Sequence, residues 1–246
     1  YNSITNFYAS RKNDSQVAQR CEDLLMIQSE LSNESNNIQM DTTSFNIVLK
    51  AWSNSGQGID GAQRAESLLQ MMKKLHNNGH ENVKPDTYSY STVFGAYSKV
   101  NPEDASTAVD RVMDLLDELE GSYISSTDNI NSCYNSAANA IVKNGVEDAV
   151  VKVQELMMRM KNMDAVPNNY LITSLIEAYA LDGSDDSISK GKEILVEMMD
   201  SPEPELKPNS VPFNVLLNAT LKRDSTNNVE LAEDILLSME KKRVLH

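Results

Sequence analysis

The chain has 246 residues with a formal net charge of −14; 40% of its residues are hydrophobic and 24% are charged. This balance excludes a disordered chain, and no apolar run reaches the length that crosses a bilayer, so we expect a soluble protein of one large or two ordinary domains. The acidity argues, at first sight, against a nucleic-acid partner.

Two cysteines, Cys21 and Cys133, lie far apart and form no CxxC pair. This usage favours a reducing compartment and argues against a zinc module. The chain opens on Tyr1 instead of Met, so we expect it to be a segment of a longer protein.

One pattern recurs along the chain. A large residue, here called the anchor, begins each copy at intervals of 38 to 45 residues: Tyr1, Phe45, Tyr90, Tyr134, Ile172 and Phe213. Each anchor starts an apolar stripe at i, i+3, i+4 and i+7, which is one face of a helix. We therefore expect first helices over residues 1–10, 42–54, 87–99, 131–143, 169–181 and 210–222.

A second helix is expected after each of these. The octets "AQRCEDLL" (18–25) and "AQRAESLL" (62–69) match closely, and weaker versions follow, such as "VVKVQELM" and "ELAEDILL". Turn-rich connectors separate the copies, and several close with Pro followed by Asp or Asn, at 85–86, 167–168 and 208–209. Pro there ends one helix, and the polar residue can cap the next.

These features predict an all-α fold, an α-solenoid of stacked helix-turn-helix repeats similar to tetratricopeptide repeats, wound as a right-handed superhelix. We expect a single domain of about six repeats. Their boundaries are 1–41 (partial), 42–86, 87–130, 131–168, 169–209 and 210–246 (truncated).

A small polar residue follows every anchor: Asn2, Asn46, Ser91, Asn135, Thr173 and Asn214. Asn is unfavourable inside helices because its side chain competes for backbone hydrogen bonds, so a repeated amide or hydroxyl here suggests a function. The alternative is a polar helix face that happens to be rich in Asn.

The stretches "DTTSFNIVLKAW" and "KPDTYSYSTVFGAYSK" resemble the pentatricopeptide-repeat motif, and the resemblance extends over essentially the whole chain. The tetratricopeptide signature W-x₂-L-G-x₂-Y is absent from all six first helices. The resemblance implies binding of single-stranded RNA, with one repeat reading one base through two or three side chains.

By this resemblance, the residue after the anchor reads the base together with the last residue of its repeat. The implied pairs are Asn2 with Asp41 and Asn46 with Asp86 for uridine, Asn135 with Asn168 for a pyrimidine, cytidine favoured, and Thr173 with Asn209 for adenosine. Ser91 with Asp128 would read guanosine, although strict counting places Ile130 there. Asn214 has no partner in the sequence.

The resemblance also implies two further sets of contacts. The residue two before each anchor would pack on the base: Thr43, Tyr88, Ser132, Tyr170 and Val211. For the two tyrosines, burial against the next hairpin is the alternative. Lysines late in the first helices would contact phosphate: Lys50, Lys99, Lys143 and Lys222. Only Glu177 opposes these lysines within the first helices, whereas acidic residues crowd the expected second helices and loops.

Catalytic and metal-site signatures are absent from the sequence. His76 and His80 stand near Glu81, but the segment reads as a loop without a third ligand, so we expect no metal. The carboxylates of the second helices are interpreted as solvated. No nucleophile elbow, P-loop or deaminase signature occurs, and we expect neither a cofactor nor an enzyme activity in this segment.

The leading hypothesis is sequence-selective binding of single-stranded RNA in organelle RNA processing, stability or translation, with a mitochondrial or plastid location implied by the family alone. Other proteins of an RNA-processing complex are expected partners, whereas a membrane or a small-molecule substrate is not. Two alternatives remain open: a protein-binding scaffold, and the RNA-guiding arm of a nuclease or editing enzyme whose catalytic domain lies outside the segment.

Overall fold

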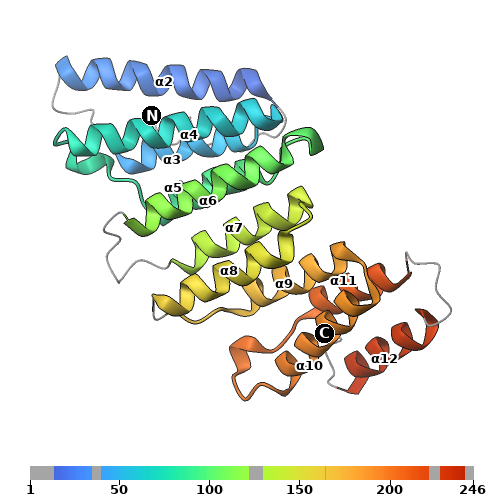
Figure 1. Ribbon diagram of the computed structural model, residues 1–246. Coiled ribbons are helices and arrows are strands. Elements are labelled where there is room, and N and C mark those ends of the chain that lie inside the picture. The colour runs from blue at the N-terminus through green and yellow to red at the C-terminus, as the bar shows by residue number, and fades with distance from the viewer. Residues whose placement is uncertain (1–13, 35–39, 122–129, 164, 222–227, 242–246) are drawn as a thin grey trace. The chain divides into compact units, whose positions relative to one another are not determined.

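The computed structural model describes residues 14–34, 40–121, 130–163, 165–221 and 228–241 (Figure 1). Within these ranges the regular structure is helical throughout, and no strand occurs. The chain divides into two compact units, residues 1–144 and 145–246, and the division falls inside the predicted repeat 131–168. The described part of the chain contains no helix that combines the length and the apolar character needed to span a bilayer.

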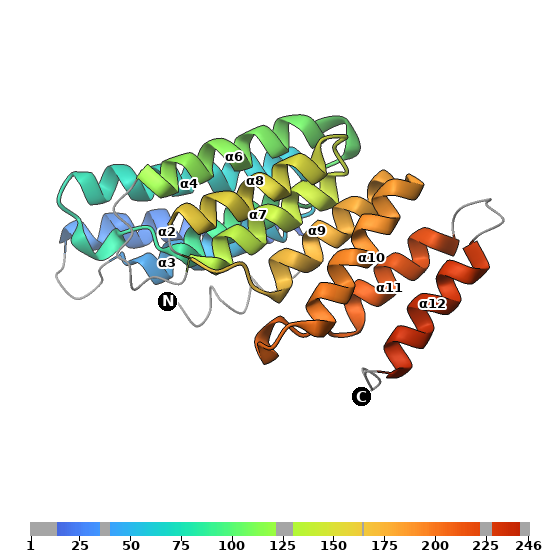
Figure 2. The same ribbon diagram turned by 60° about the horizontal axis from the view of Figure 1, so that its bottom comes forward.

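The first unit alternates first and second helices in chain order. Its helices are α2 (Ser15–Glu34), α3 (Thr42–Ser53), α4 (Gly58–Asn77), α5 (Thr87–Tyr97), α6 (Ala105–Gly121) and α7 (Asn131–Asn144), with short 3₁₀ turns η1 (Glu81–Val83) and η2 (Pro102–Asp104). Helix α3 packs on α2, α4 and α5, and α5 packs on α4, α6 and α7. Consecutive first helices α3, α5 and α7 thus lie side by side (Figures 1 and 2).

The second unit has the same alternation. It contains α8 (Ala149–Asn162), α9 (Asn169–Asp182), α10 (Asp185–Asp200), η3 (Pro204–Leu206), α11 (Ser210–Leu221) and α12 (Asn228–Lys241). Helix α9 packs on α8, α10 and α11, and α11 packs on α10 and α12. The described first helices begin and end within two residues of the predicted ranges, so the prediction from apolar periodicity is confirmed.

Most of the described anchors lie in the core, and Tyr1 lies outside the described residues. Phe45, Tyr134 and Phe213 are fully buried and Tyr90 is 3% exposed, whereas Ile172 is only partly buried against the cluster around Phe213. Burying one such side chain stabilises the fold by about 1.5–3 kcal/mol. For Phe45, Tyr90, Tyr134 and Phe213 the periodic pattern is therefore the pattern of the packed face. In α9 the order is reversed, because Thr173 is 8% exposed and the anchor Ile172 is only partly buried.

Side-chain caps explain where several first helices begin. The carboxylate of Asp41 accepts from the Ser44 amide at 2.7 Å, and that of Asp86 accepts from the Ser89 amide at 2.8 Å. In the second unit, Asn168 Oδ1 accepts from the Leu171 amide at 3.1 Å. The polar residue that closes one predicted repeat is therefore the N-cap of the next first helix, as the connectors predict.

The connector between α9 and α10 is short. Only Gly183 and Ser184 of the polar stretch "LDGSDDSIS" separate the two helices, because α10 already begins at Asp185. Gly183 ends α9 in the left-handed region at φ 68°, and Ser184 caps α10 by accepting from the Ser187 amide at 3.1 Å. Asp185 and Asp186 then occupy the first turn of α10, where negative charge is favourable because of the helix dipole. The superhelix and its handedness remain predictions.

Candidate nucleic-acid interface

The structure brings together the predicted pair Asn46 and Asp86. Asn46 Nδ2 lies 3.2 Å from Asp86 Oδ1 and 3.4 Å from Oδ2, and the Ser89 hydroxyl donates to Asn46 Oδ1 at 2.7 Å. Asn46 is only 9% exposed, whereas Asp86, at the N-terminus of α5, is exposed. The amide is thus bonded within the protein, and the carboxylate is the part of the pair that faces solvent.

The pair Thr173 and Asn209 is arranged differently. Thr173 is 8% exposed, and its hydroxyl lies 3.2 Å from Asn169 Oδ1 on the same helix. Asn209 is exposed and accepts from the Val211 amide at 2.9 Å, which caps the start of α11. Among the residues that the structure describes, no hydrogen bond joins Thr173 directly to Asn209.

The remaining predicted base-reading residues differ in their surroundings. The Ser91 hydroxyl donates to the Thr87 carbonyl at 2.7 Å, Asn135 is partly buried, and Asn214 is exposed. Asn135 Oδ1 is inaccessible to solvent and has no hydrogen-bond partner in the described ranges. Its predicted partner Asn168 belongs to the other unit, so this pair stays a prediction. Asn2 and Asp128 lie outside the described residues.

All five predicted base-packing side chains are exposed, and each is the second residue of its helix: Thr43, Tyr88, Ser132, Tyr170 and Val211. Tyr88 is 50% exposed and Tyr170 69% exposed. Neither tyrosine ring is therefore buried against the next hairpin, the alternative left open by the sequence. A base approaching the start of α5 or α9 would meet an aromatic face.

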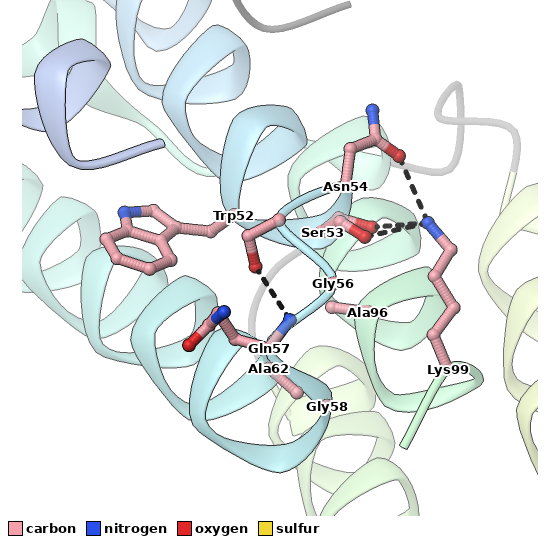
Figure 3. A pocket seen from close by; sticks show the side chains of 10 residues that line it. Trp52, Ser53, Asn54, Gly56, Gln57, Gly58, Ala62, Ala96 and Lys99 are labelled. Atoms are coloured by element: carbon pink, nitrogen blue, oxygen red, sulfur yellow. Dashed lines mark hydrogen bonds between the residues drawn. The ribbon is translucent and has the colours of Figure 1, made fainter. Parts of the chain in front are cut away.

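The predicted phosphate-contacting lysines do not share one environment. Lys99 Nζ donates to the Ser53 carbonyl at 2.8 Å and to Asn54 Oδ1 at 3.2 Å, which closes the C-terminus of α3 (Figure 3). Lys143, in the last turn of α7, is exposed; there Asn144 makes the corresponding bond, 3.0 Å to the Tyr97 carbonyl at the end of α5. Lys50 is partly buried, and Lys222 lies outside the described residues.

A hollow of about 420 Å³ lies beside Lys99 (Figure 3). It is lined by residues 52–58, where α3 turns into α4, and by Ala62, Ala96 and Lys99. The Ser55 hydroxyl accepts from the Gln57 amide at 3.3 Å, and the lysine is bonded to the end of α3. The polar groups at this hollow therefore hold the turn between α3 and α4 in place.

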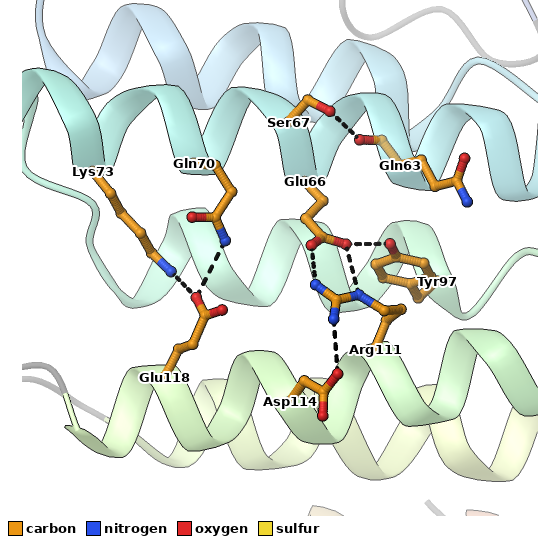
Figure 4. A network of polar contacts seen from close by, with 9 residues as sticks. All are labelled: Gln63, Glu66, Ser67, Gln70, Lys73, Tyr97, Arg111, Asp114 and Glu118. Carbon is orange, nitrogen blue, oxygen red and sulfur yellow. Dashed lines mark hydrogen bonds and ion pairs between the residues drawn. The ribbon is translucent and has the colours of Figure 1, made fainter.

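The second helices contain a network that the sequence interpretation missed (Figure 4). Glu66 of α4 accepts hydrogen bonds from the Tyr97 hydroxyl of α5 and from the Arg111 guanidinium of α6, and Arg111 also contacts Asp114 at 2.7 Å. Burial, and then the bond to Glu66, raises the pKa of Tyr97 far above its usual value. The bond to Glu66 also raises the pKa of Arg111. One carboxylate thus connects three consecutive helices.

The same arrangement occurs one hairpin earlier. Glu22 of α2 accepts from Trp52 Nε1 of α3 at 2.8 Å and from Arg64 Nε of α4 at 2.9 Å. We call each set an inter-hairpin clamp: Glu22, Trp52 and Arg64 form the first, and Glu66, Tyr97 and Arg111 form the second. The Glu22 and Glu66 side chains are 4% and 13% exposed. These acids are not solvated, contrary to the expectation from the sequence. The Arg-x-Glu pattern that the octets 18–25 and 62–69 share was the sequence signal that could have indicated the clamps.

Further ion pairs join second helices within each unit. Glu118 of α6 pairs with Lys73 of α4 and accepts a hydrogen bond from Gln70 at 3.2 Å (Figure 4), and Lys192 of α10 pairs with Asp234 of α12 at 2.8 Å. Burial alone would raise the pKa of Glu118, but the hydrogen bonds from Lys73 and Gln70 outweigh it, so the pKa is lowered.

No group of three or more potential metal ligands occurs in the part of the chain that the structure describes. His76 Nδ1 lies 3.9 Å from Glu81 Oε2. That contact joins the last turn of α4 to η1.

Stacked helical hairpins, buried anchors and a polar residue after each anchor define a protein of the helical-repeat type. Over 178 residues the chain is 27% identical to a pentatricopeptide repeat-containing protein of Arabidopsis thaliana. The match covers 72% of this chain and 27% of that protein, so it spans about a quarter of the relative's length. No protein-family model matches the chain. The similarity supports a helical repeat of the pentatricopeptide kind.

Proposed function

We propose that this chain binds single-stranded RNA sequence-selectively, with one repeat per base. The observation that supports the proposal most directly is the contact between Asn46 and Asp86, which lie 40 positions apart and meet at the exposed start of α5. The family resemblance alone selects this pair from the sequence. The contact places an exposed carboxylate beside an amide, and such groups can hydrogen-bond the edge of a base.

The exposed carboxylate of Asp86 determines which base edge fits. A carboxylate only accepts hydrogen bonds, so it suits the N3–H of uracil and repels the acceptor nitrogens N1 of adenine and N3 of cytosine. A hydrogen bond to a charged group contributes about 1.5–3 kcal/mol, net of the bonds to water that it replaces. Asn209, by contrast, is an exposed amide and presents both a donor and an acceptor.

The exposed second residue of each first helix supplies the packing surface. Tyr88 and Tyr170 present rings on which a base can stack, and such stacking contributes about 1–3 kcal/mol per base. Thr43, Ser132 and Val211 are smaller and offer less contact. We therefore expect the repeats that begin at α5 and α9 to hold their bases more tightly than the others.

The charge distribution limits the affinity. Lys99 is engaged at the end of α3, which leaves Lys143 and Lys50 as the described members of the predicted phosphate-contacting set. With two or three phosphate contacts in all, the slope of log affinity against log salt would be roughly −1.4 to −2.1. Such binding suits a role in organelle RNA processing, stability or translation, in which this segment supplies recognition without catalysis.

A double substitution tests the proposal. Asn46→Thr with Asp86→Asn should shift the preferred base at one position from U towards A, measured by fluorescence anisotropy with RNAs that differ at that position. Asn218→Thr, which changes an exposed Asn of α11 that does not follow an anchor, should leave the preference unchanged. A wild-type chain that binds all these RNAs equally would overturn the proposal.

A protein-binding scaffold is the second candidate. It is favoured by the hydrogen bonds of Asn46, whose amide is bonded to Asp86 and Ser89 and is only 9% exposed. In that case Asn46 would serve to join two hairpins. The double substitution would then lower the free energy of unfolding without any effect on base preference.

A further inference from the structure

The first residue of two first helices makes the same long-range bond. The Thr42 hydroxyl at the start of α3 donates to the Lys84 carbonyl at 2.7 Å and also contacts the Asn82 carbonyl at 3.2 Å. In the second unit, Asn169 Nδ2 at the start of α9 donates to the Lys207 carbonyl. Both acceptors belong to a Lys-Pro-Asp/Asn segment, residues 84–86 and 207–209.

The segment that receives this bond is stiff. Lys84 and Lys207 are extended, with ψ of 125° and 134°, as expected before proline. Pro85 and Pro208 then fix the next φ near −65°. Because only a proline separates the bonded carbonyl from Asp86 or Asn209, holding that carbonyl also fixes where the cap residue lies.

The same bonds connect each cap to the residue predicted to read the base with it. In the first unit, Asn46 bonds Asp86 directly while Thr42 holds the segment before it. In the second unit, Thr173 is linked to Asn169 at 3.2 Å, and Asn169 is bonded to the Lys207 carbonyl. The residues of the first pair, Asn46 and Asp86, are therefore bonded directly, and those of the second pair are linked through Asn169, the first residue of α9.

We infer that Thr42 and Asn169 are positioning residues: they hold the cap side chains of Asp86 and Asn209 in place, and so determine how strictly each repeat selects its base. The inference rests on the RNA-binding function proposed above. Without this bond the carboxylate of Asp86 could move relative to Asn46. Base selection would then weaken more than overall affinity, because stacking and phosphate contacts would remain.

Thr42→Val tests the inference, because it keeps the shape of the side chain and removes the donor. Thr42→Ser keeps the hydroxyl. Thr87→Val is the matched control: Thr87 is the first residue of α5, and its hydroxyl makes no hydrogen bond to the residues that the structure describes. Two measurements are made on each variant. The first is the preference for U over A, and the second is the hydrogen-exchange rate of the Ser89 amide N–H, which donates a hydrogen bond to Asp86 Oδ1.

For Thr42→Val we expect exchange at Ser89 to rise and the preference for U over A to fall, each by about threefold to tenfold, the effect of one net hydrogen bond. Thr42→Ser and Thr87→Val should behave as wild type. Unchanged exchange, or faster exchange with an unchanged base preference, would show that Thr42 does not position a base-reading group.

The two proposals fail separately. A wild-type chain without base preference overturns the RNA-binding function, and the exchange rate at Ser89 then still decides whether Thr42 holds the cap. Should Thr42→Val not fold, Asn169→Asp serves instead, because it removes the donor to the Lys207 carbonyl and keeps the oxygen that faces Thr173. It should weaken selection at the position read by Thr173 and Asn209; an unchanged preference there contradicts the inference.

Discussion

Lys99 Nζ lies 2.8 Å from the carbonyl oxygen of Ser53, so a lysine just after α5 closes the end of α3. The last carbonyls of a helix lack partners within it, and a cation there is favourable because of the helix dipole. A lysine expected from the sequence to contact phosphate thus has a structural partner one hairpin earlier.

Lys99 and Lys143 occupy equivalent positions but have different partners, so substituting each of them should have a different effect. Lys99→Ala should lower the free energy of unfolding by about 0.5–1.5 kcal/mol, because the end of α3 loses its donor. Lys143→Ala should leave stability nearly unchanged and make the salt dependence of RNA binding shallower by about 0.7. Urea denaturation and binding at several salt concentrations measure the two effects. The reverse pattern would assign the phosphate contact to Lys99.

Glu66→Gln should destabilise the first unit clearly, because it removes the charge that Tyr97 and Arg111 both bond. The Glu66 side chain is 13% exposed, and we expect a loss of about 1–3 kcal/mol. Glu118→Gln is the control, since Glu118 is 43% exposed and its pair with Lys73 should contribute about 0–1 kcal/mol. Equal losses in urea denaturation would mean that the clamp adds nothing beyond a surface pair.

Tyr97→Phe should change how stability depends on pH. The folded-state pKa of Tyr97 is raised, so its contribution is fully present below the unfolded value of about 10 and is lost as pH rises above it. Wild type should therefore be more stable than Tyr97→Phe at pH 8, and the difference should shrink above pH 10.

Denaturation at pH 8 and pH 10.5 measures this difference. Tyr88→Phe, at a position 50% exposed, should match wild type at both values. A difference between wild type and Tyr97→Phe that grows with pH would contradict the assignment.

Helix positions could be predicted from the sequence because their signals are local. The apolar stripe that starts at Phe45 or Tyr90 marks a buried face, and Asp41, Asp86 and Asn168 mark helix starts through bonds that span only three residues. The pairing of Asn46 with Asp86 came from the family resemblance and not from spacing.

The clamps could not be predicted in the same way, because they depend on distances between separate helices. Glu66 is two residues from Arg64, a spacing that puts the side chains on different faces, so the acid looked solvated. Its partner Arg111 stands 45 residues away. The bond between Lys99 and Ser53, 46 residues earlier, could not be predicted for the same reason, and a phosphate contact of Lys99 stays a prediction.

The two clamps also influence how such a chain can gain or lose repeats. Arg64 and Glu66 both lie on α4; Arg64 bonds Glu22 of α2 and Glu66 bonds Arg111 of α6, so α4 takes part in both clamps. Deletion of one repeat, from a point in α2 after Glu22 to the equivalent point in α4, would bring Glu22 into contact with Tyr97 and Arg111 in place of Trp52 and Arg64. Repeats could thus be deleted or duplicated without leaving an unpaired charge in the interior. A fold with one central core does not tolerate such changes in the same way.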